Sequence, residues 1–223
     1  MRSRHADYFN HDEDAPGYDA DVADESNPIR AGYAAVLDWV VERAGIGPQA
    51  RVLDLGSGTG NLSGRIAACG ELVCVDVSRA MNRLAAPKLA HLEDVSFVEA
   101  DLLEFFDLDR GCFDAVLSTY AVHHLTEDEK ERFFARVAAC LKPGGRAVFG
   151  DLMLEREEQA DSFVRQYRAA GDLDAAEAVE EEFFWRIDTA TATLRRLGLR
   201  AECRRFSELS WGIALQRAVE DAP

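Results

Sequence analysis

The sequence predicts a single α/β domain in which helices cover both faces of a mostly parallel sheet. Strand-like apolar runs alternate with helix-like runs between residues 51 and 154, which is typical of βα units. The strand-like runs are rich in Val, Leu and Phe in both registers, as expected of strands that are buried on both faces. A chain of 223 residues, 48% of them hydrophobic, is long enough for one such domain with a cap.

The first elements follow from hydrophobic periodicity and from the residues that end helices. Residues 29–45 place apolar side chains at helical spacing, and Gly45 and Pro48 end the predicted helix. The next predicted elements are a buried strand over 51–56, a helix over 61–70 and a strand over 71–78.

Two later helices carry N-terminal cap signals. Ser78 is placed to cap a helix over 78–90, which breaks near Pro87. Thr126 and Glu129 have the spacing of a capping box at the start of a helix over 126–145, which a Pro-Gly-Gly sequence ends. The remaining predicted strands are 95–101, 112–122, 146–154, 199–206 and 211–219.

Two segments lie outside this regular pattern. Residues 1–28 are polar and acidic, so we expect an arm, although Tyr8, Phe9 and Tyr18 indicate that it folds over something. Residues 155–190 are long and helical and follow the fifth strand, where a helical substrate cap is expected. The predicted organisation is therefore an arm over 1–28 and a main domain over 29–223.

The composition narrows the functional classes. A net charge of −16 argues against nucleic acid as the main partner, because an acidic surface repels phosphate backbones. No apolar run is long enough for a membrane span, and the N-terminus lacks the apolar region of a secretory signal. Five cysteines without a C-x-x-C pair are typical of free thiols, so we expect a cytoplasmic protein without a metal site. The oligomeric state is not predicted.

A glycine-rich loop after the first strand predicts a binding site. Gly56, Gly58 and Gly60 follow that strand directly, at the sheet edge where α/β folds bind ligands. Asp76, twenty residues after Gly56, ends the second strand and can accept hydrogen bonds from a ribose. A dinucleotide fingerprint needs glycine at position 61, which is Asn61, so a nicotinamide dehydrogenase is disfavoured.

Five ordered motifs carry a family resemblance. "VLDLGSGTGN", "VCVDVS", "VEADLLEF", "FDAVLSTYAVHHL" and "LKPGGRAVFGD" occur in the order and at about the spacing of class I S-adenosylmethionine-dependent methyltransferases. The resemblance covers residues 30–154, and "STYAVHHLTEDEK" looks most like the small bacterial YrrT-like group. It implies a Rossmann-like fold with a mostly parallel seven-stranded sheet, an antiparallel last strand and helices on both faces.

The same resemblance implies which residues bind the cofactor, S-adenosylmethionine, and its product S-adenosylhomocysteine. Asp76 would hold the ribose, Asp101 and the Leu102 N–H would contact the adenine, and Tyr18, then Tyr8, would close over the methionine end. The full implied set is Tyr8, Tyr18, Asp54, Gly56, Gly58, Gly60, Asp76, Val77, Met81, Asp101, Leu102, Thr119 and Ala121. Four alternatives stay open: Asp54 buttresses the loop, Asp76 and Asp101 are ordinary strand-end carboxylates, Met81 belongs to the core, or the tyrosines clip the arm in place.

The chemistry of methyl transfer requires mainly alignment of the reacting atoms, with a base if the nucleophile carries a proton. His123 and His124 follow the fourth strand at the ligand edge and are the candidate catalytic residues. In the cap, Phe183, Phe184 and Trp185 with Arg186 suit an acceptor wall, or they pack a helix onto the sheet.

The resulting hypothesis is methyl transfer to an O, N or S atom of a small molecule. An RNA acceptor, tRNA included, is the alternative, and its footprint would be a basic patch. The arginines of that patch would be Arg195, Arg196, Arg200, Arg204 and Arg205. A second alternative is a methyltransferase-like module that binds the cofactor without catalysis.

Overall fold

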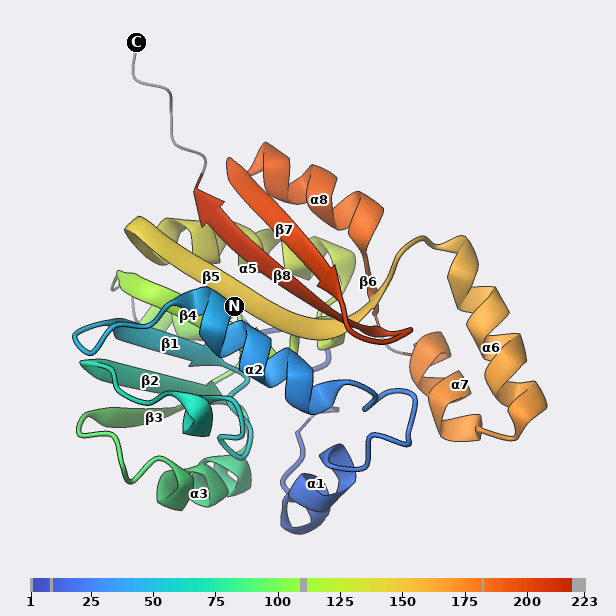
Figure 1. Ribbon diagram of the computed structural model, residues 1–223, viewed down its shortest axis with the longest axis horizontal. Coiled ribbons are helices and arrows are strands. Elements are labelled where there is room, and N and C mark those ends of the chain that lie inside the picture. The colour runs from blue at the N-terminus through green and yellow to red at the C-terminus, as the bar shows by residue number, and fades with distance from the viewer. Residues whose placement is uncertain (1, 9, 109–111, 182, 218–223) are drawn as a thin grey trace.

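The protein folds as one twisted sheet with a layer of helices on each face (Figure 1). The computed structural model describes residues 2–8, 10–108, 112–181 and 183–217. The strands of the sheet follow the order β3-β2-β1-β4-β5-β8-β7, and a short strand β6 pairs with β5 beside this path. The predicted Rossmann-like α/β class is confirmed, with a two-residue eighth strand added to the expected seven.

The strands run parallel from β3 to β5 and end in an antiparallel hairpin. β5 and β8 pair antiparallel, and so do β7 and β8, which confirms the expected antiparallel last strand. Residues 218 and 219 of the predicted last strand lie outside the described residues. The strands are β1 (Arg51–Leu55), β2 (Glu71–Asp76), β3 (Val95–Glu99), β4 (Phe113–Thr119), β5 (Leu141–Leu154), β6 (Trp185–Arg186), β7 (Leu199–Arg205) and β8 (Ser210–Arg217).

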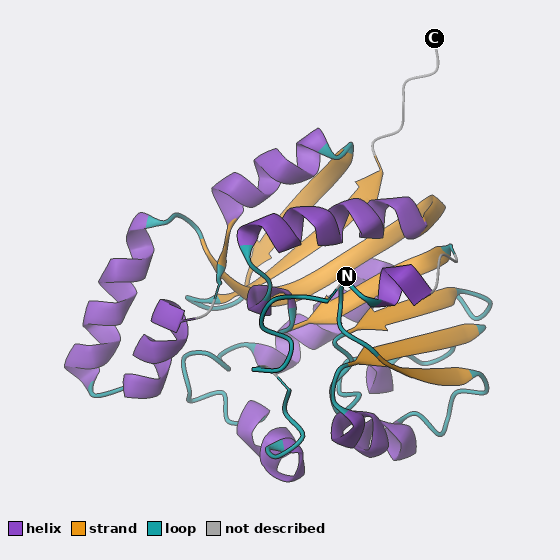
Figure 2. Cartoon of the chain, turned by 180° about the vertical axis from the view of Figure 1, so that it is seen from behind, coloured by secondary structure: helices purple, strands orange, loops and turns teal. Residues whose placement is uncertain are grey.

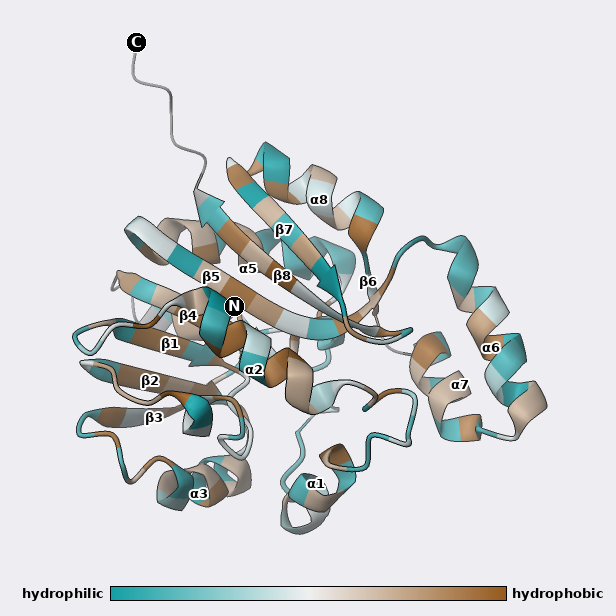
Figure 3. Ribbon diagram, viewed as in Figure 1, coloured by the Kyte–Doolittle hydropathy of each residue, from teal (hydrophilic) through white to brown (hydrophobic). Residues whose placement is uncertain are grey.

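Helices cover both faces of the sheet, as Figures 1 and 2 show. The cluster of buried side chains on one face includes α2 and α3, and the cluster on the other face includes α5 and α8. Hydrophobic residues lie along the central strands, whereas α6 carries many hydrophilic ones (Figure 3). The helices are α1 (Ala15–Val22), α2 (Tyr33–Ala44), α3 (Arg79–Lys88), α4 (Phe105–Leu108), α5 (Glu127–Cys140), α6 (Glu158–Ala170), α7 (Leu173–Glu181) and α8 (Ile187–Arg196).

Two paired glycines let α2 lie close to the sheet. Gly150 in β5 and Gly212 in β8 face each other in the strand register. A Cβ atom added at Gly150 would come within 2.1 Å of Val36, and one added at Gly212 within 2.3 Å of the Trp39 ring. The absence of side chains at these two positions therefore leaves a slot for the buried face of α2.

The predicted helix over 61–70 is wrong. The segment forms a single 3-10 turn, Ser63–Arg65, after which Ile66 is extended. Leu62 and Ile66 have helical spacing and are buried, but only a few residues separate them from Gly70. An added Cβ at Gly70 would come within 2.9 Å of the Gln49 backbone, so the chain must already have returned to the sheet there.

The predicted boundary between the helix over 126–145 and the strand over 146–154 also changes. The capping box of Thr126 and Glu129 is present, but α5 ends at Cys140 and β5 begins at Leu141. The pairing of β4 with β5 shifts register between Phe113 and Ala115, which marks a bulge. The Pro-Gly-Gly sequence therefore lies within an irregular strand instead of forming a helix end followed by a turn.

The arm and the cap lie beyond the ends of the parallel strands (Figures 1 and 2). The arm contains a helix of its own, α1, and the predicted helical cap consists of α6, α7 and the start of α8. The sequence 183–186 within the cap is not helical, and Trp185 and Arg186 form β6 instead. Within the described residues, no helix has the length and apolar character that crossing a membrane requires.

The glycine slot gives a first prediction. Replacing Gly212 by alanine places a methyl group against the Trp39 ring, so we expect Gly212→Ala to lower the free energy of unfolding by about 1–3 kcal/mol. Urea denaturation measures this change. Gly47→Ala is the control, because no atom lies within 4 Å of its added Cβ. Equal stability of the two variants would contradict the slot.

Candidate active site

The glycine loop adopts a conformation that L side chains rarely adopt. Gly56, Gly58 and Gly60 have φ angles of 70°, 51° and 78°. A Cβ atom at Gly56 would come within 2.5 Å of the Ala121 side chain, and one at Gly60 within 3.0 Å of Ala85. The first glycine thus permits contact with the loop after β4, and the third permits contact with α3.

The loop after β4 makes the matching turn. Tyr120 has φ 51°, which is uncommon for a residue other than glycine and marks local strain. Its backbone N–H donates to the Gly150 carbonyl at 2.8 Å, and its hydroxyl lies 3.2 Å from Ser210 Oγ. These bonds hold the turn that brings Ala121 against the glycine loop.

A cavity lies between these two loops, at the carboxyl ends of β1 to β4. The space between the loops amounts to about 680 Å³, part of it open to solvent. A second space of about 270 Å³ continues from it toward Tyr33, Thr59 and Asn61. The predicted site residues that line the main cavity are Tyr18, Gly56, Gly58, Asp76, Val77, Met81, Asp101, Leu102, Thr119, Ala121 and His124.

Four predicted site residues do not line this cavity. Gly60 packs against α3, and His123 is buried beside His124, with ring centroids 4.0 Å apart. Tyr8 is 73% exposed to solvent and lies outside the cavity lining. Asp54 is fully buried beneath the loop.

Asp76 and Asp101 line neighbouring parts of the cavity wall. Asp76 accepts hydrogen bonds from the backbone N–H groups of Gly58 and Ser78, each at 2.8 Å, and burial raises its pKa above the usual value. Asp101 Oδ1 accepts from the Leu103 N–H at 3.0 Å. The two carboxylates thus lie at the ends of adjacent strands and line one space.

The position of Asp54 agrees with the alternative interpretation, in which this residue buttresses the glycine loop. Its Oδ2 accepts a hydrogen bond from Ser63 Oγ at 2.6 Å, which ties the strand to the turn after the loop. Burial raises the pKa of Asp54 to about 7. This geometry fits a residue that supports the loop from behind.

The two histidines have different environments. His123 is buried, and its Nδ1 lies 2.5 Å from Asp151 Oδ1. Asp151 also accepts from the backbone N–H groups of Val122 and His123, at 2.8 and 3.2 Å. His124 lines the cavity, and burial, together with the neighbouring charges of His123 and His11, lowers its pKa well below 6.5.

The arm contributes cavity residues that sequence reasoning missed. Ser3 donates its backbone N–H to Asp101 Oδ1 at 2.8 Å and its hydroxyl to Oδ2 at 2.6 Å. Ala6 and His11 also line the cavity. Small and polar residues in an acidic arm carry no periodic signal, so only the arm's aromatic residues had pointed to the site.

Two aspartates attach the arm further along the cavity. Asp12 accepts from Ser78 Oγ at 2.6 Å and from the Ala80 N–H at 3.1 Å, at the start of α3. Asp19 accepts from Thr59 Oγ1 at 2.6 Å and also bonds Asn61 and Lys88. The arm therefore crosses the cavity from the end of β3 to the glycine loop.

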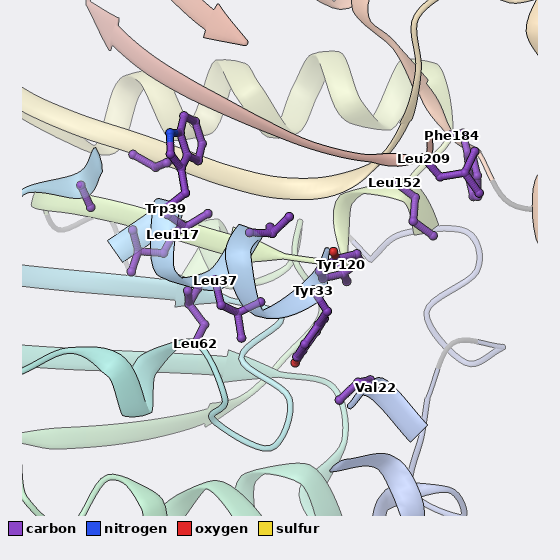
Figure 4. Close-up of a cluster of buried hydrophobic side chains, with 14 of the residues drawn as sticks. Val22, Tyr33, Leu37, Trp39, Leu62, Leu117, Tyr120, Leu152, Phe184 and Leu209 are labelled. Atoms are coloured by element: carbon purple, nitrogen blue, oxygen red, sulfur yellow. The ribbon is translucent and has the colours of Figure 1, made fainter. Parts of the chain in front are cut away.

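The aromatic residues of the cap pack in the core. Trp185 stacks on Phe134 of α5 with ring centroids 4.4 Å apart, and Phe184 is buried among Leu152 and Leu209 (Figure 4). The buried Lys130 Nζ donates to the Phe183 carbonyl, and the Phe183 N–H donates to the His123 carbonyl at 3.1 Å. These contacts join the cap to the histidine loop.

The five arginines proposed as an RNA footprint do not form one patch. Arg200 lines a surface hollow with Arg43 of α2, whereas Arg205 stacks over Trp211 toward the other face. Strand alternation separates neighbours in β7 in this way. Arg195 and Arg196 lie on α8, which covers that other face.

Together, the sheet order and the cavity at its strand ends define the class: a Rossmann-like methyltransferase fold. The solved structure of magnesium protoporphyrin IX methyltransferase from Synechocystis with bound SAH has this fold. It superposes with a TM-score of 0.68 at 20% sequence identity, over 95% of this chain and 97% of that one.

Sequence comparison identifies the family. Residues 52–145 match the family described as a methyltransferase domain. An uncharacterized methyltransferase of Anoxybacillus flavithermus is 33% identical over 174 residues, 76% of this chain and 78% of the relative. Another, from Oceanobacillus iheyensis, is 30% identical over 207 residues, 91% and 93% of the two chains. The chain therefore belongs to the methyltransferase family.

The raised pKa of Asp54 predicts a pH-dependent stability. The folded state holds the Asp54 proton up to about pH 7, whereas the unfolded chain releases it near the usual value of 3.8. Stability is therefore lost as the pH rises through this window. Asp54→Asn removes the titration, so we expect the variant to gain up to about 3 kcal/mol over wild type between about pH 5 and pH 8.

Thermal unfolding of both proteins at about pH 5 and at about pH 8 measures this gain. Asp94→Asn, at an exposed site, is the control. A constant difference between Asp54→Asn and wild type across the range would show that Asp54 is ionised throughout.

Proposed function

We propose that this methyltransferase uses S-adenosylmethionine to methylate an O, N or S atom of a small molecule. The observation that carries the proposal is the shared cavity of the glycine loop, Asp76 and Asp101. A loop without side chains lets a ligand approach the backbone, and each acid can accept hydrogen bonds from a nucleoside. The solved methyltransferase structure of the same fold contains bound SAH, which supports S-adenosylmethionine as the cofactor of this protein.

The residues present fit a nucleoside cofactor. An added Cβ at Gly58 meets no atom within 4 Å, so this part of the loop borders open space. Asp76, already fixed by two backbone N–H groups, would accept the ribose hydroxyls, and Asp101 with Leu102 would hold the adenine. Met81 is buried at 2% exposure and lines the cavity, which suits the apolar face of a base.

The chain's contribution to the reaction would be alignment and proton handling. The cofactor supplies an activated methyl group as a sulfonium. Orientation of the nucleophile in the cavity lowers the barrier by restricting motion, by roughly 7–11 kcal/mol in favourable cases. His124 lines the cavity as a neutral ring and would take up a proton that the acceptor releases as the methyl group is transferred, while Asp151 and His123 hold its loop.

Charge and surface favour a small acceptor over RNA. The net charge of −16 repels a phosphate backbone, and the candidate arginines are divided between two faces of the sheet. We place the protein in the YrrT-like group and in the cytoplasm, with the motif over residues 118–130 and five free cysteines as support. The cap over 155–190 would roof the acceptor.

Calorimetric titration with S-adenosylmethionine and S-adenosylhomocysteine tests the cofactor. We expect micromolar binding to the wild type and binding weaker by about 100-fold to Asp76→Ala, because two charge-assisted hydrogen bonds are lost. Asp94→Ala, at an exposed site, should bind as the wild type does. Failure of the wild type to bind either ligand, with binding of NAD instead, would show that the glycine loop was misinterpreted.

Turnover separates an enzyme from a binding module. A screen of small acceptors with radiolabelled cofactor should find transfer that His124→Ala slows while the affinity for S-adenosylhomocysteine stays unchanged. Binding without transfer to any acceptor would favour the non-catalytic alternative.

We further propose that residues 1–28 close over the bound cofactor. The arm's bonds from Asp12 and Asp19 to α3 and the glycine loop support this role. Limited proteolysis should cut the arm less in the presence of S-adenosylhomocysteine, and Asp19→Ala should remove that protection. Asp7→Ala, at a site 87% exposed, is the control. Identical cleavage with and without ligand would exclude closure.

A further inference from the structure

The beginning of the arm is bonded to Asp101, the acid that is expected to contact the adenine. Ser3 gives both of its donors to this carboxylate, the backbone N–H at 2.8 Å and the hydroxyl at 2.6 Å. Ser3 and Asp101 are both buried, and both line the main cavity. They are 98 positions apart in the chain, so this pair of bonds is a tertiary contact within the site itself.

The residues that follow Ser3 hold it in this place. The backbone N–H of Arg4 donates to Glu129 Oε1 at 2.7 Å, and Oε2 of Glu129 belongs to the capping box of α5. The ring of His5 lies beside that of Phe183 in the cap, with centroids 5.2 Å apart. Three consecutive residues of the arm are therefore attached to the end of β3, to the start of α5 and to the cap.

This contact differs from the other attachments of the arm. Asp12 and Asp19 are exposed acids of the arm that accept hydrogen bonds from the domain, for example from Ser78 and Lys88. At Asp101 the direction is reversed, because the arm donates and the acceptor is a buried acid of the cavity wall. The arm can thus be attached without an acid of the ligand site, so this pair of bonds indicates a role in ligand binding.

The carboxylate of Asp101 has little remaining capacity to accept hydrogen bonds. Each carboxylate oxygen accepts about two. Oδ1 already accepts from the backbone N–H groups of Ser3 and Leu103, at 2.8 and 3.0 Å, and Oδ2 accepts from the Ser3 hydroxyl. Within the described residues, one acceptor position therefore remains on Oδ2, and donors on both oxygens keep the carboxylate from turning.

We propose that Ser3 is a positioning residue that determines which base the cofactor carries, because it holds the Asp101 carboxylate in one orientation. The inference rests on the proposed function, in which Asp101 accepts a hydrogen bond from the adenine. An amino group donates and matches the remaining position on Oδ2. A keto oxygen at the same place on the ring would face a carboxylate that cannot turn away, and two acceptors in contact at a buried position are unfavourable.

The Ser3 hydroxyl makes this preference one-directional. A serine hydroxyl can in general donate or accept. Here its proton goes to Asp101 Oδ2, at a length typical of charge-assisted O–H···O⁻ bonds, so the oxygen presents only lone pairs to a ligand. Turning the hydroxyl toward a keto group would break this bond and leave Oδ2 beside the keto oxygen.

The experiment compares two ligands that differ only in the base. S-adenosylhomocysteine has the amino group, and S-inosylhomocysteine has a keto oxygen in its place. We expect calorimetric and displacement titrations of the full chain to show a wild-type preference for the adenosyl ligand of about 100-fold or more, because a site that forms hydrogen bonds rejects an analogue that cannot form them. Ser3→Ala should lower this preference by about tenfold.

Ser26→Ala is the matched control. Ser26 also belongs to the arm, and it also donates its backbone N–H and its hydroxyl to one carboxylate, that of Asp24, at 3.1 and 2.5 Å. Ser26 is exposed and lies outside the cavity lining, so its variant should keep the wild-type preference. A double-mutant cycle adds Asp101→Ala, in whose background Ser3→Ala should change the preference no further.

Each outcome bears on the inference. If Ser3→Ala weakens both ligands equally, Ser3 only attaches the arm and the inference is wrong. It is also wrong if the wild type binds both ligands equally, or if the effects of Ser3→Ala and Asp101→Ala on the preference add, because Ser3 would then act without Asp101. Failure of the wild type to bind either ligand would instead overturn the proposed function.

Discussion

The close approach of Gly56 to Ala121 is the constraint on which the site depends. Only 2.5 Å separates a Cβ built at Gly56 from the Ala121 side chain, so no other residue fits the first position of the loop without displacing the second loop. This contact joins the ends of β1 and β4, where the strand order 3-2-1-4-5 reverses direction. Ligands bind at such switch points because the two loops diverge to opposite faces. The strained φ of Tyr120 belongs to the same constraint, since Tyr120 turns the β4 chain so that Ala121 meets the glycine.

The acidic character of the arm has a structural use. Asp12 and Asp19 accept hydrogen bonds from groups at the N-terminus of α3 and in the glycine loop, where backbone and hydroxyl donors are concentrated. A carboxylate near a helix N-terminus is also favoured by the helix dipole. Part of the net negative charge therefore attaches the arm to the domain, while other acidic residues of the arm, such as Asp7, remain exposed.

Sequence reasoning predicted the elements whose signals are local. The Ser78 cap, the capping box at Thr126 and the closing hairpin all depend on residues that are neighbours in the chain or alternate along it. It failed where tertiary contacts decide. The spacing of Leu62 and Ile66 fits a helix, yet the return of the chain to Gln49 shortens it to one turn. Of the predicted site, the strand-end residues lie at the cavity because topology brings strand ends together. Ser3 and His11 could not be found, because their position depends on where an irregular arm folds.

The two adjacent histidines have different environments within one loop. Asp151 accepts bonds from the Val122 and His123 backbone and faces the His123 ring, so one buried carboxylate fixes three groups of the loop. Phe183 connects the same loop to the cap, because its N–H donates to the His123 carbonyl, and its own carbonyl accepts from Lys130 of α5. His124 is the next residue in the chain and lines the cavity. A cationic ring there would repel a sulfonium, and burial prevents that by lowering its pKa. A neutral ring held by a rigid neighbour is compatible with a positively charged cofactor. The ring can take up a proton from the acceptor only as methyl transfer removes the positive charge from the sulfur, because a cationic ring beside the sulfonium is unfavourable.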